Sequence, residues 1–595
     1  KVSDGKTIKT PVTKMAEKQL LTTTNPPSTS AIQPPTPSLP NDIPKKPLSF
    51  HISLLTLTLL ALIVSWDTTA LSVAIPLITS QLHASTLQAF LANIAFTLAV
   101  AISQPLYLSV SDAVGRKIPL YVSMLLFTIG SIMFALARSI GVVIAGRLVQ
   151  GFGGYVRGGL DILQEIIIVD MTSLKERPKY LALMALPIAL GSIMGPIIGA
   201  LLCQFVTWRW LGWINLPFVG PAIPLAVLFM RLQPLEQDLK TKLRRVDWGG
   251  MFLFTIGTTC IALPVSWADA LYPWSSWRTY VPLIVGIISF IIFGFYEAHP
   301  VQPMLPYRLF KSRTAVVSII GGGIHGLLLF SILLYLPLFF QVRLESLSSP
   351  SSLCCQTTTT STLKSNPQLK PKTPQAVYLQ TPLSSALSIL PACVISVLSS
   401  VLAPLLVSHT RHYTLLLRTG WALLTLSTGL LYTITQTTSQ AQKTTILLLL
   451  GIGLGIVFQT IPFPLQASVS DADDSGRLVG LLVITRFLGG LLGLAIGSVV
   501  FNSGFARQIA IFGELPVEVG GLSDSSQAIG FIPMLRTVGV DAEVMRRLLE
   551  AYRIPFRSLW VVLAAISGVG FVMSLFTEEL DLEREELGRQ RFSEA

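Results

Sequence analysis

Residues 51–78 read HISLLTLTLLALIVSWDTTALSVAIPLI, and this stretch decides the class of fold. Asp67 is its only residue with a formal charge at pH 7, and most of the others are apolar. The hydrocarbon core of a bilayer is about 30 Å thick, so a helix of about 20 mostly apolar residues crosses it. We therefore expect residues 51–78 to form a transmembrane helix.

Further apolar stretches of comparable length occur along the chain. They lie at 88–110, 118–138, 140–168, 180–202, 210–230, 247–267, 277–297, 314–340, 382–407, 413–435, 444–464, 479–502 and 557–577. Together these stretches predict an all-α integral membrane protein with about fourteen transmembrane helices.

The composition agrees with lipid as the solvent for much of the surface. Of the 595 residues, 51% are hydrophobic and only 12% are charged, whereas a soluble domain carries about 25% charged residues. The formal net charge is +12, and many of the basic residues lie in short loops between apolar segments. No basic stripe with interleaved aromatic residues is present, so we interpret the charge as membrane topology and expect no nucleic-acid partner.

The sequence lacks the residue patterns of an enzyme or a metal protein. Its five cysteines show neither metal-ligand nor disulfide spacing. It contains no nucleophile–base set and no phosphate-binding loop. We therefore expect no catalytic residues, no metal site and no cofactor.

The distribution of lysine and arginine predicts the orientation in the membrane. If the N-terminus is cytoplasmic, the short outer loops hold only Arg138, Arg209, Arg278 and Lys443. The inner loops then hold Arg116, Lys117, Lys175, Arg177, Lys179, Arg231, Lys240, Lys242, Arg244, Arg245, Arg308, Lys311, Arg313, Arg411 and Arg477. Because basic loops stay on the cytoplasmic side, we expect the N-terminus inside, and an even number of spans places the C-terminus inside too.

Polar segments interrupt the apolar pattern. Residues 1–48 and 341–381 are rich in Ser, Thr and Pro, and both are predicted to be disordered because they cannot bury enough apolar surface. Residues 503–556 are expected to form a long outer loop, in which the amphipathic piece around Glu543 to Tyr552 is a surface helix. Residues 578–595 form an acidic tail.

The loop Ser111-Asp112-Ala113-Val114-Gly115-Arg116-Lys117 joins the second and third predicted spans. Gly115 permits a tight turn, and Asp112 can cap the next helix or pair with a base. Arg116 and Lys117 hold the loop in the cytoplasm. The loop is a candidate gate, and its simpler interpretation is a topological anchor.

The fourth predicted span carries charged residues inside an apolar helix. Arg147 and Gln150 lie in Gly146-Arg147-Leu148-Val149-Gln150-Gly151. An arginine in hydrocarbon costs at least about 2.5–3.5 kcal/mol on insertion scales, so it needs a partner or a wet cavity. We therefore expect both side chains to line a cavity or a gate.

The same span also carries two acids, Asp161 and Glu165, one turn apart on one face. A carboxylic acid buried in a membrane can exchange protons, so both are candidates for proton coupling. The simpler interpretation is that these acids lie near the inner end and pair with Arg116 or Arg157. We favour that interpretation for Glu165 and for Asp170.

The fifth predicted span reads Gly191-Ser192-Ile193-Met194-Gly195-Pro196-Ile197-Ile198-Gly199. Glycines at a spacing of four let two helices approach closely, and Pro196 frees a carbonyl group and bends the helix. Ordinary packing of small residues is the simpler interpretation, but the Gly-Pro pair adds to the signal.

Three other polar residues stand in apolar spans. Asp67 is a candidate for proton coupling by default, because a carboxylate in a membrane is costly, and a structural hydrogen-bonded aspartate is the equal alternative. Arg486, beside Gly489 and Gly490, is a candidate for lining the cavity. His325 follows three glycines and is more simply interpreted as a helix contact.

Taken in order, these motifs resemble the major facilitator superfamily, and more narrowly the fungal fourteen-spanner drug:proton antiporters. Ser111–Lys117 resembles the inner-loop motif, although Tyr107 and Leu108 stand where an opening glycine is common. The run 147–151 is similar to the fourth-helix motif, and Gly191 to Gly199 to the antiporter motif. Residues 66–76 resemble the first-helix motif, and Trp208-Arg209-Trp210 with Ile214-Asn215-Leu216-Pro217 the entry to the sixth helix.

The resemblance implies two six-helix bundles, at 49–230 and 314–577, with a linker and two extra transmembrane helices inserted at 231–313. It also implies alternating access about a central cavity, driven by a proton gradient. The chain departs from the family where Tyr155-Val156-Arg157 separates two glycine pairs, since three extra helical residues rotate the remainder of the helix by about 300°. Tyr155–Arg157 and about 342–375 are either real insertions or errors in the gene model.

We expect a secondary transporter that exports small hydrophobic organic compounds, such as drugs, toxins or secondary metabolites, in exchange for protons. The proton path would use Asp67 first and Asp161 second, with Arg147 tuning both. We expect a monomer in the plasma membrane rather than the vacuolar membrane. The alternatives are a vacuolar or plasma-membrane transporter of basic amino acids or siderophores, which would need more cavity acids, and a non-transporting receptor on the same scaffold.

Overall fold

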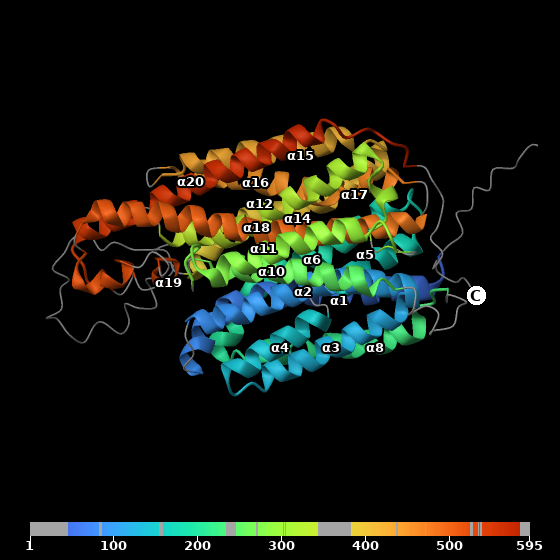
Figure 1. The fold of residues 1–595 in the computed structure, drawn as a ribbon, viewed down its shortest axis with the longest axis horizontal. Coiled ribbons are helices and arrows are strands. Elements are labelled where there is room, and N and C mark those ends of the chain that lie inside the picture. The colour runs from blue at the N-terminus through green and yellow to red at the C-terminus, as the bar shows by residue number, and fades with distance from the viewer. Residues whose placement is uncertain are drawn as a thin grey trace, which may run out of the picture. The chain divides into compact units, whose positions relative to one another are not determined.

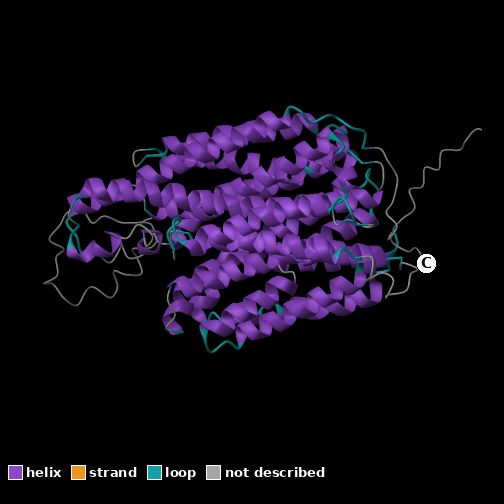
Figure 2. Ribbon diagram, viewed as in Figure 1, coloured by secondary structure: helices purple, strands orange, loops and turns teal. Residues whose placement is uncertain are grey.

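A computed structural model describes the protein, and its regular elements are helices (Figure 2). The described residues are 46–82, 86–153, 159–233, 246–268, 272–300, 303, 305–342, 382–435, 438–469, 472–513, 515–523, 528–532, 535 and 538–582. Every contact below lies within the compact unit that begins at Pro47. The expected disorder of 1–48 and 341–381 and the Tyr155–Arg157 insertion fall almost wholly outside the described residues.

The helices fall into two groups with a pair between them (Figure 1). The group that we call the first half consists of α1 (Leu48–Gln81), α2 (Thr86–Val114), α3 (Lys117–Ala135), α4 (Ile140–Gly153), α5 (Gly159–Met171), α6 (Arg177–Phe205), α7 (Trp210–Trp213) and α8 (Leu216–Phe229). The inserted pair is α10 (Trp248–Trp267) and α11 (Trp277–Tyr296). The second half consists of η1 (Tyr307–Phe310), α12 (Arg313–Gln341), α14 (Pro382–Thr410), α15 (Thr414–Leu430), η2 (Leu431–Thr433), α16 (Gln440–Thr460), α17 (Pro462–Ala467), α18 (Ala472–Phe512), η3 (Val517–Ser523), α19 (Ala528–Phe531) and α20 (Ala542–Ser574).

The lengths and composition of these helices suit a membrane. Within the described part of the chain, 12 helices are long and apolar enough to cross a bilayer, and Leu98–Val114 and Ile140–Gly153 are shorter apolar helices. The structure therefore supports the predicted all-helical membrane fold. The predicted number of fourteen spans stays a prediction.

Helix α11 has an exposed apolar face that suits contact with lipid. Ile284, Ile287, Ile291 and Phe295 recur at helical spacing, and each exposes more than half of its surface. A continuous apolar face of this kind is unfavourable in water, whereas it matches the hydrocarbon of a bilayer. The exposed face of α11 is therefore a lipid-facing surface.

The antiporter-like glycines place α6 directly against α1. A Cβ atom added to Gly191 would lie 2.5 Å from the carbonyl oxygen of Leu62, and one added to Gly199 would lie 2.6 Å from that of Ala70. A Cβ on Gly195 would lie 2.6 Å from the carbonyl oxygen of Trp66. Each position thus requires glycine for close approach of the two backbones.

Helices α18 and α20 are the longest described helices of the second half. Helix α18 has 41 residues, which corresponds to about 60 Å of helix, about twice the thickness of the hydrocarbon core. At the left of Figure 1, α18 and α20 extend beyond the neighbouring helices. Within the expected loop 503–556, residues 503–512 continue α18 and residues 542–556 belong to α20.

Aromatic packing explains these extensions. Tyr552 on α20 lies against Phe505 on α18, with ring centroids 4.6 Å apart, and its hydroxyl donates to the Ala528 carbonyl at 2.8 Å. Leu548 is fully buried. The amphipathic piece around Glu543 to Tyr552 is therefore the first part of α20, rather than the separate surface helix expected from the sequence.

Candidate functional site

A buried polar cluster lies inside the first half, around Asp67 of α1. Arg147 of α4 donates from Nη1 to Asp67 Oδ2 at 2.7 Å, and Asn215, which precedes α8, donates from Nδ2 to Asp67 Oδ1 at 3.0 Å. Asp67 is 5% exposed and Arg147 is 2% exposed. Both oxygens of the carboxylate thus accept hydrogen bonds, which offsets the high cost of burying its charge.

Further hydrogen bonds fix the partners of Asp67. Arg147 Nη1 also donates to Gln150 Oε1 at 3.1 Å, and Gln150 Nε2 donates to the Ser131 hydroxyl at 2.8 Å. Trp66 Nε1 donates to Asn215 Oδ1 at 3.2 Å. We call these six residues the Asp67 cluster: Trp66, Asp67, Ser131, Arg147, Gln150 and Asn215.

Arg147 keeps unused hydrogen-bonding capacity inside the Asp67 cluster. Its Nε and Nη2 atoms are buried and have no hydrogen-bond partner among the described residues. The guanidinium instead lies 4.1 Å from the centroid of the Phe96 ring, a contact that stabilises a cation. The charge of Arg147 is therefore balanced mainly by Asp67.

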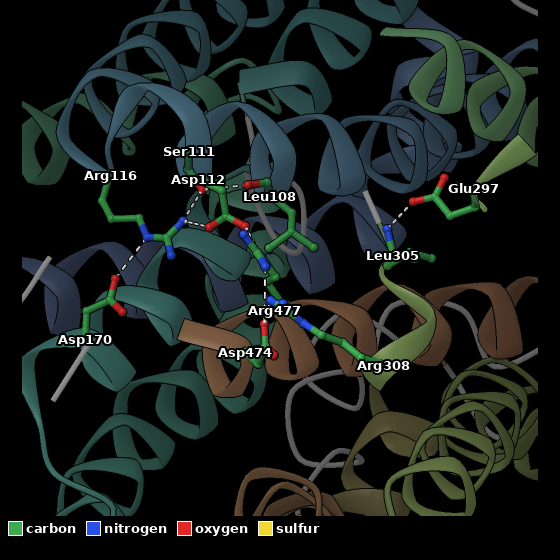
Figure 3. Close-up of polar contacts among 10 residues, drawn as sticks. All are labelled: Leu108, Ser111, Asp112, Arg116, Asp170, Glu297, Leu305, Arg308, Asp474 and Arg477. Carbon is green, nitrogen blue, oxygen red and sulfur yellow. Dashed lines mark hydrogen bonds and ion pairs between the residues drawn. The ribbon is translucent and has the colours of Figure 1, made fainter. Parts of the chain in front are cut away.

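A second polar cluster lies at the end of the bundle where α2 meets α18, and Figure 3 shows it. Its charges alternate in sign, and we call it the ion-pair chain: Asp170, Arg116, Asp112, Arg477, Asp474 and Arg308. In that order, the nitrogen–oxygen distances between successive members are 2.9, 2.5, 2.8, 3.2 and 2.7 Å.

Arg116 illustrates how strongly the ion-pair chain stabilises its members. It is 4% exposed and also donates to the Ser111 hydroxyl at 2.7 Å. Burial alone would lower the pKa of Arg116, but Asp170 and Asp112 outweigh it and raise the pKa above its usual value. Arg116 therefore stays charged at every physiological pH.

The ion-pair chain joins the two halves. Asp112 belongs to α2 of the first half, whereas Arg477 and Asp474 belong to α18 of the second half. Arg177 of α6 adds a second connection, since its Nη1 donates to Gln466 Oε1 and to the Ser475 hydroxyl, each at 2.9 Å. These contacts hold the halves together at this end of the bundle.

The structure brings together many of the predicted site residues. Asp67, Arg147 and Gln150 meet in one cluster, and Asp112 and Arg116 meet in the other. The pairing of Asp170 with Arg116, the simpler interpretation, is confirmed.

The other predicted residues occupy separate places. Lys117 begins α3 and is half-buried, and Glu165 is half-buried on α5. Asp161 lies on α5 and Pro196 on α6, but their side chains are outside the described part. Their predicted roles therefore stay predictions.

Arg486 and His325 both lie against Phe458 of α16 in the core of the second half. The Arg486 guanidinium lies 4.4 Å from the centroid of the Phe458 ring and donates to the Phe458 carbonyl oxygen. His325 is fully buried, with Nε2 at 3.2 Å from the Leu454 carbonyl oxygen. The centroid of its ring also lies 5.7 Å from the centroid of the Phe458 ring, so His325 is part of the contact between α12 and α16, as its simpler interpretation predicts.

Sequence reasoning missed Asn215 as a site residue. A polar residue just before a helix normally caps that helix, but the Asn215 side chain makes no capping hydrogen bond and turns to Asp67 instead. Asp474 and Arg308 were missed because neither stands in an apolar span. The alternation of acidic and basic residues near the predicted helix ends is the sequence feature that could have indicated these ion pairs.

A small cavity lies at the opposite end of the second half. Its volume is about 30 Å³, and the ends of α12, η2 and α20 line it, including Phe339, Arg553 and Phe556. Such a volume holds only one or two water molecules. It is therefore too small to bind an organic substrate.

Comparisons with known proteins identify the family. The family model described as Major Facilitator Superfamily matches residues 57–494. The MFS-type transporter sphD of Aspergillus fumigatus is 40% identical over 93% of this chain and 89% of its own. The MFS-type efflux pump LUC4 of Fusarium is 29% identical over 99% of this chain and 96% of its own.

A solved structure supports the fold. A bacterial homologue of the human lysosomal transporter Spinster, in an inward-facing and occupied conformation, matches with a TM-score of 0.50 at 15% identity. The match covers 93% of this chain and 100% of that one. The chain belongs to the major facilitator superfamily of membrane transporters.

Proposed function

We propose that the protein is a proton-coupled antiporter that exports small hydrophobic organic compounds. The long similarity to a protein named as an efflux pump supports export. The observation that carries the proton coupling is the buried pair of Asp67 and Arg147, which are 2.7 Å apart within apolar helices. An ionisable residue inside the membrane is a candidate for function by default.

The pair gives a physical route from protonation to conformational change. A proton on Asp67 removes the negative charge that balances Arg147. The buried Arg147 then needs a new counter-charge or contact with water. The protonated and deprotonated forms therefore favour different arrangements of α1 and α4, and a proton gradient shifts the populations of those arrangements.

The ion-pair chain supplies the gate in this proposal. Exchange between the two access states requires the halves to separate at one end and then at the other. Breaking the bridge between Asp112 and Arg477 would open the end at which they lie. The close contact of α1 with α6 at Gly195 lets these helices move as one body, and Pro196 would set the geometry of the exchange.

We also propose the full topology of the family, with fourteen spans and both termini in the cytoplasm. In the part of the chain that the structure describes, the 12 long apolar helices and the two shorter ones together make fourteen elements. On this assignment the ion-pair chain faces the cytoplasm, and α10 and α11 are the two extra spans. The monomer and the plasma-membrane location remain part of the proposal.

Transport by purified protein in lipid vesicles tests the proton coupling. Asp67→Asn keeps the size of the side chain but removes its titration, so we expect it to abolish efflux driven by a pH gradient while the protein still folds. The matched control is Asp541→Asn, because Asp541 caps α20 and asparagine is an equally good cap. Full pH-driven efflux by the Asp67 variant would refute the assignment.

The same vesicles test the substrate class. We expect a set of hydrophobic organic compounds to be transported against their gradients, and basic amino acids not to be. Transport restricted to basic amino acids would replace export of hydrophobic compounds as the proposed function, whatever the result for Asp67.

A further inference from the structure

The inserted pair of helices lies where it can act on the gate. Helix α10 packs on α2 of the first half and on α18 of the second half, and α11 packs on α10. The helices α2 and α18 carry Asp112 and Arg477, the two members of the ion-pair chain that connect the halves. An element that contacts both sides of a gate can hold it or release it.

The segment that joins α11 to α12, which we call the connection, begins with Glu297. This residue follows α11 and is 4% exposed, and its Oε1 accepts a hydrogen bond from the backbone amide of Leu305. Its other oxygen, Oε2, lies 3.1 Å from the position that a Cβ atom on Gly250 would occupy. Glu297 therefore packs against the first turn of α10 and also holds Leu305, which lies on the connection toward the second half.

The same connection carries Arg308, the last member of the ion-pair chain (Figure 3). Arg308 Nη2 lies 2.7 Å from Asp474 Oδ1, and Arg477 Nη1 lies 3.2 Å from the same oxygen. Two cations thus share one acceptor, and Arg308 has the shorter contact. Arg477 in turn keeps its Nε at 2.8 Å from Asp112 Oδ2.

We propose that the inserted pair positions the gate through Glu297 and Arg308. Glu297 fixes the connection, and Arg308 occupies Asp474, so that Arg477 stays directed toward Asp112. Without Arg308, Asp474 would have Arg477 as its main counter-ion and would draw it away from Asp112. This inference rests on the proposed role of the ion-pair chain as the gate, and it makes Arg308 and Glu297 positioning residues.

A pair of engineered cysteines can report how far the gate is closed. A Cβ atom on Gly476 of α18 would lie 3.5 Å from Ile166 Cγ2 of α5, in ordinary contact. Ile166→Cys and Gly476→Cys, in a protein whose five native cysteines are replaced by serine, place two thiols across the halves. The yield of their disulfide, measured per folded protein in lipid vesicles, reports the closed fraction.

We expect Arg308→Ala to lower the disulfide yield about twofold to fivefold, since a partly exposed ion pair contributes at most about a factor of five. Arg308→Lys keeps the charge and should restore most of the yield. The matched control is Lys311→Ala, which removes the same charge from an exposed site three residues away. A yield for Arg308→Ala that equals or exceeds the control overturns the proposal.

A second arm tests whether Glu297 acts through Arg308. Glu297→Ala removes the acceptor of the Leu305 amide and should lower the yield, whereas Glu297→Gln keeps an acceptor and should not. If the two residues form one tether, the double variant with Arg308→Ala lowers the yield no further than the stronger single variant. If the double variant lowers the disulfide yield by the product of the two single effects, the two residues act independently and the proposed tether is wrong.

A reference arm separates this proposal from the proposed function. Asp112→Asn weakens the gate itself and should lower the yield with the inserted pair intact. If it does so while Arg308→Ala has no effect, the gate stands and the positioning role fails. If Asp112→Asn leaves the yield unchanged, the gate fails, and with it the role assigned to Arg308.

Discussion

At the scale of single residues, most of the site residues were predicted because they are polar or charged residues within apolar spans. Asp67 and Arg147 could be identified because each is charged within a span, and the structure places them 2.7 Å apart. The sequence could not show that these two residues form a pair, because two other helices separate α1 from α4 along the chain. Asn215 belongs to the sixth-helix motif but was not assigned to the site, because a polar residue before a helix is ordinary.

Arg147 offers a test of the pair that does not depend on transport. Arg147→Ala leaves the buried Asp67 charge without its counter-ion, which should destabilise the protein by about 3–5 kcal/mol. Adding Asp67→Asn should recover part of that loss, because no charge then remains buried in the cluster. Thermal unfolding of the purified variants in detergent measures both effects, and a double variant less stable than Arg147→Ala would contradict the pairing.

At the scale of helices, the sequence predicts where apolar runs lie better than where helices stop. The glycine spacing of 191, 195 and 199 predicted a close helix contact, and its partner proves to be α1. The extension of α18 to Phe512 could not be predicted from hydropathy, since packing of Phe505 against Tyr552 continues the helix beyond the apolar window.

Two glycines provide a matched comparison at this scale. Gly195→Ala adds a Cβ atom 2.6 Å from the Trp66 carbonyl oxygen, and such overpacking costs about 1–3 kcal/mol. Gly294→Ala on α11 meets nothing within 4 Å and should be neutral or slightly stabilising, because alanine favours helix. Thermal unfolding distinguishes them, and equal stability of the two variants would show that α1 and α6 tolerate separation at Gly195.

At the scale of the whole molecule, the class of fold follows from the sequence because lipid demands long apolar helices. How the halves meet does not follow from it. Asp112 and Arg477 are 365 residues apart, and no local pattern specifies that contact. The role of the inserted pair likewise emerges only from packing, since α10 touches both α2 and α18.

The central claim is that outward movement of substrate is tied to inward movement of a proton through Asp67. The most direct measurement loads vesicles with a transported compound, imposes no pH gradient, and monitors the pH with a trapped indicator. We predict that export of the compound moves protons in the opposite direction in the wild type and moves none in Asp67→Asn. Export without any proton movement in the wild type, or unchanged proton movement in the variant, would contradict the account.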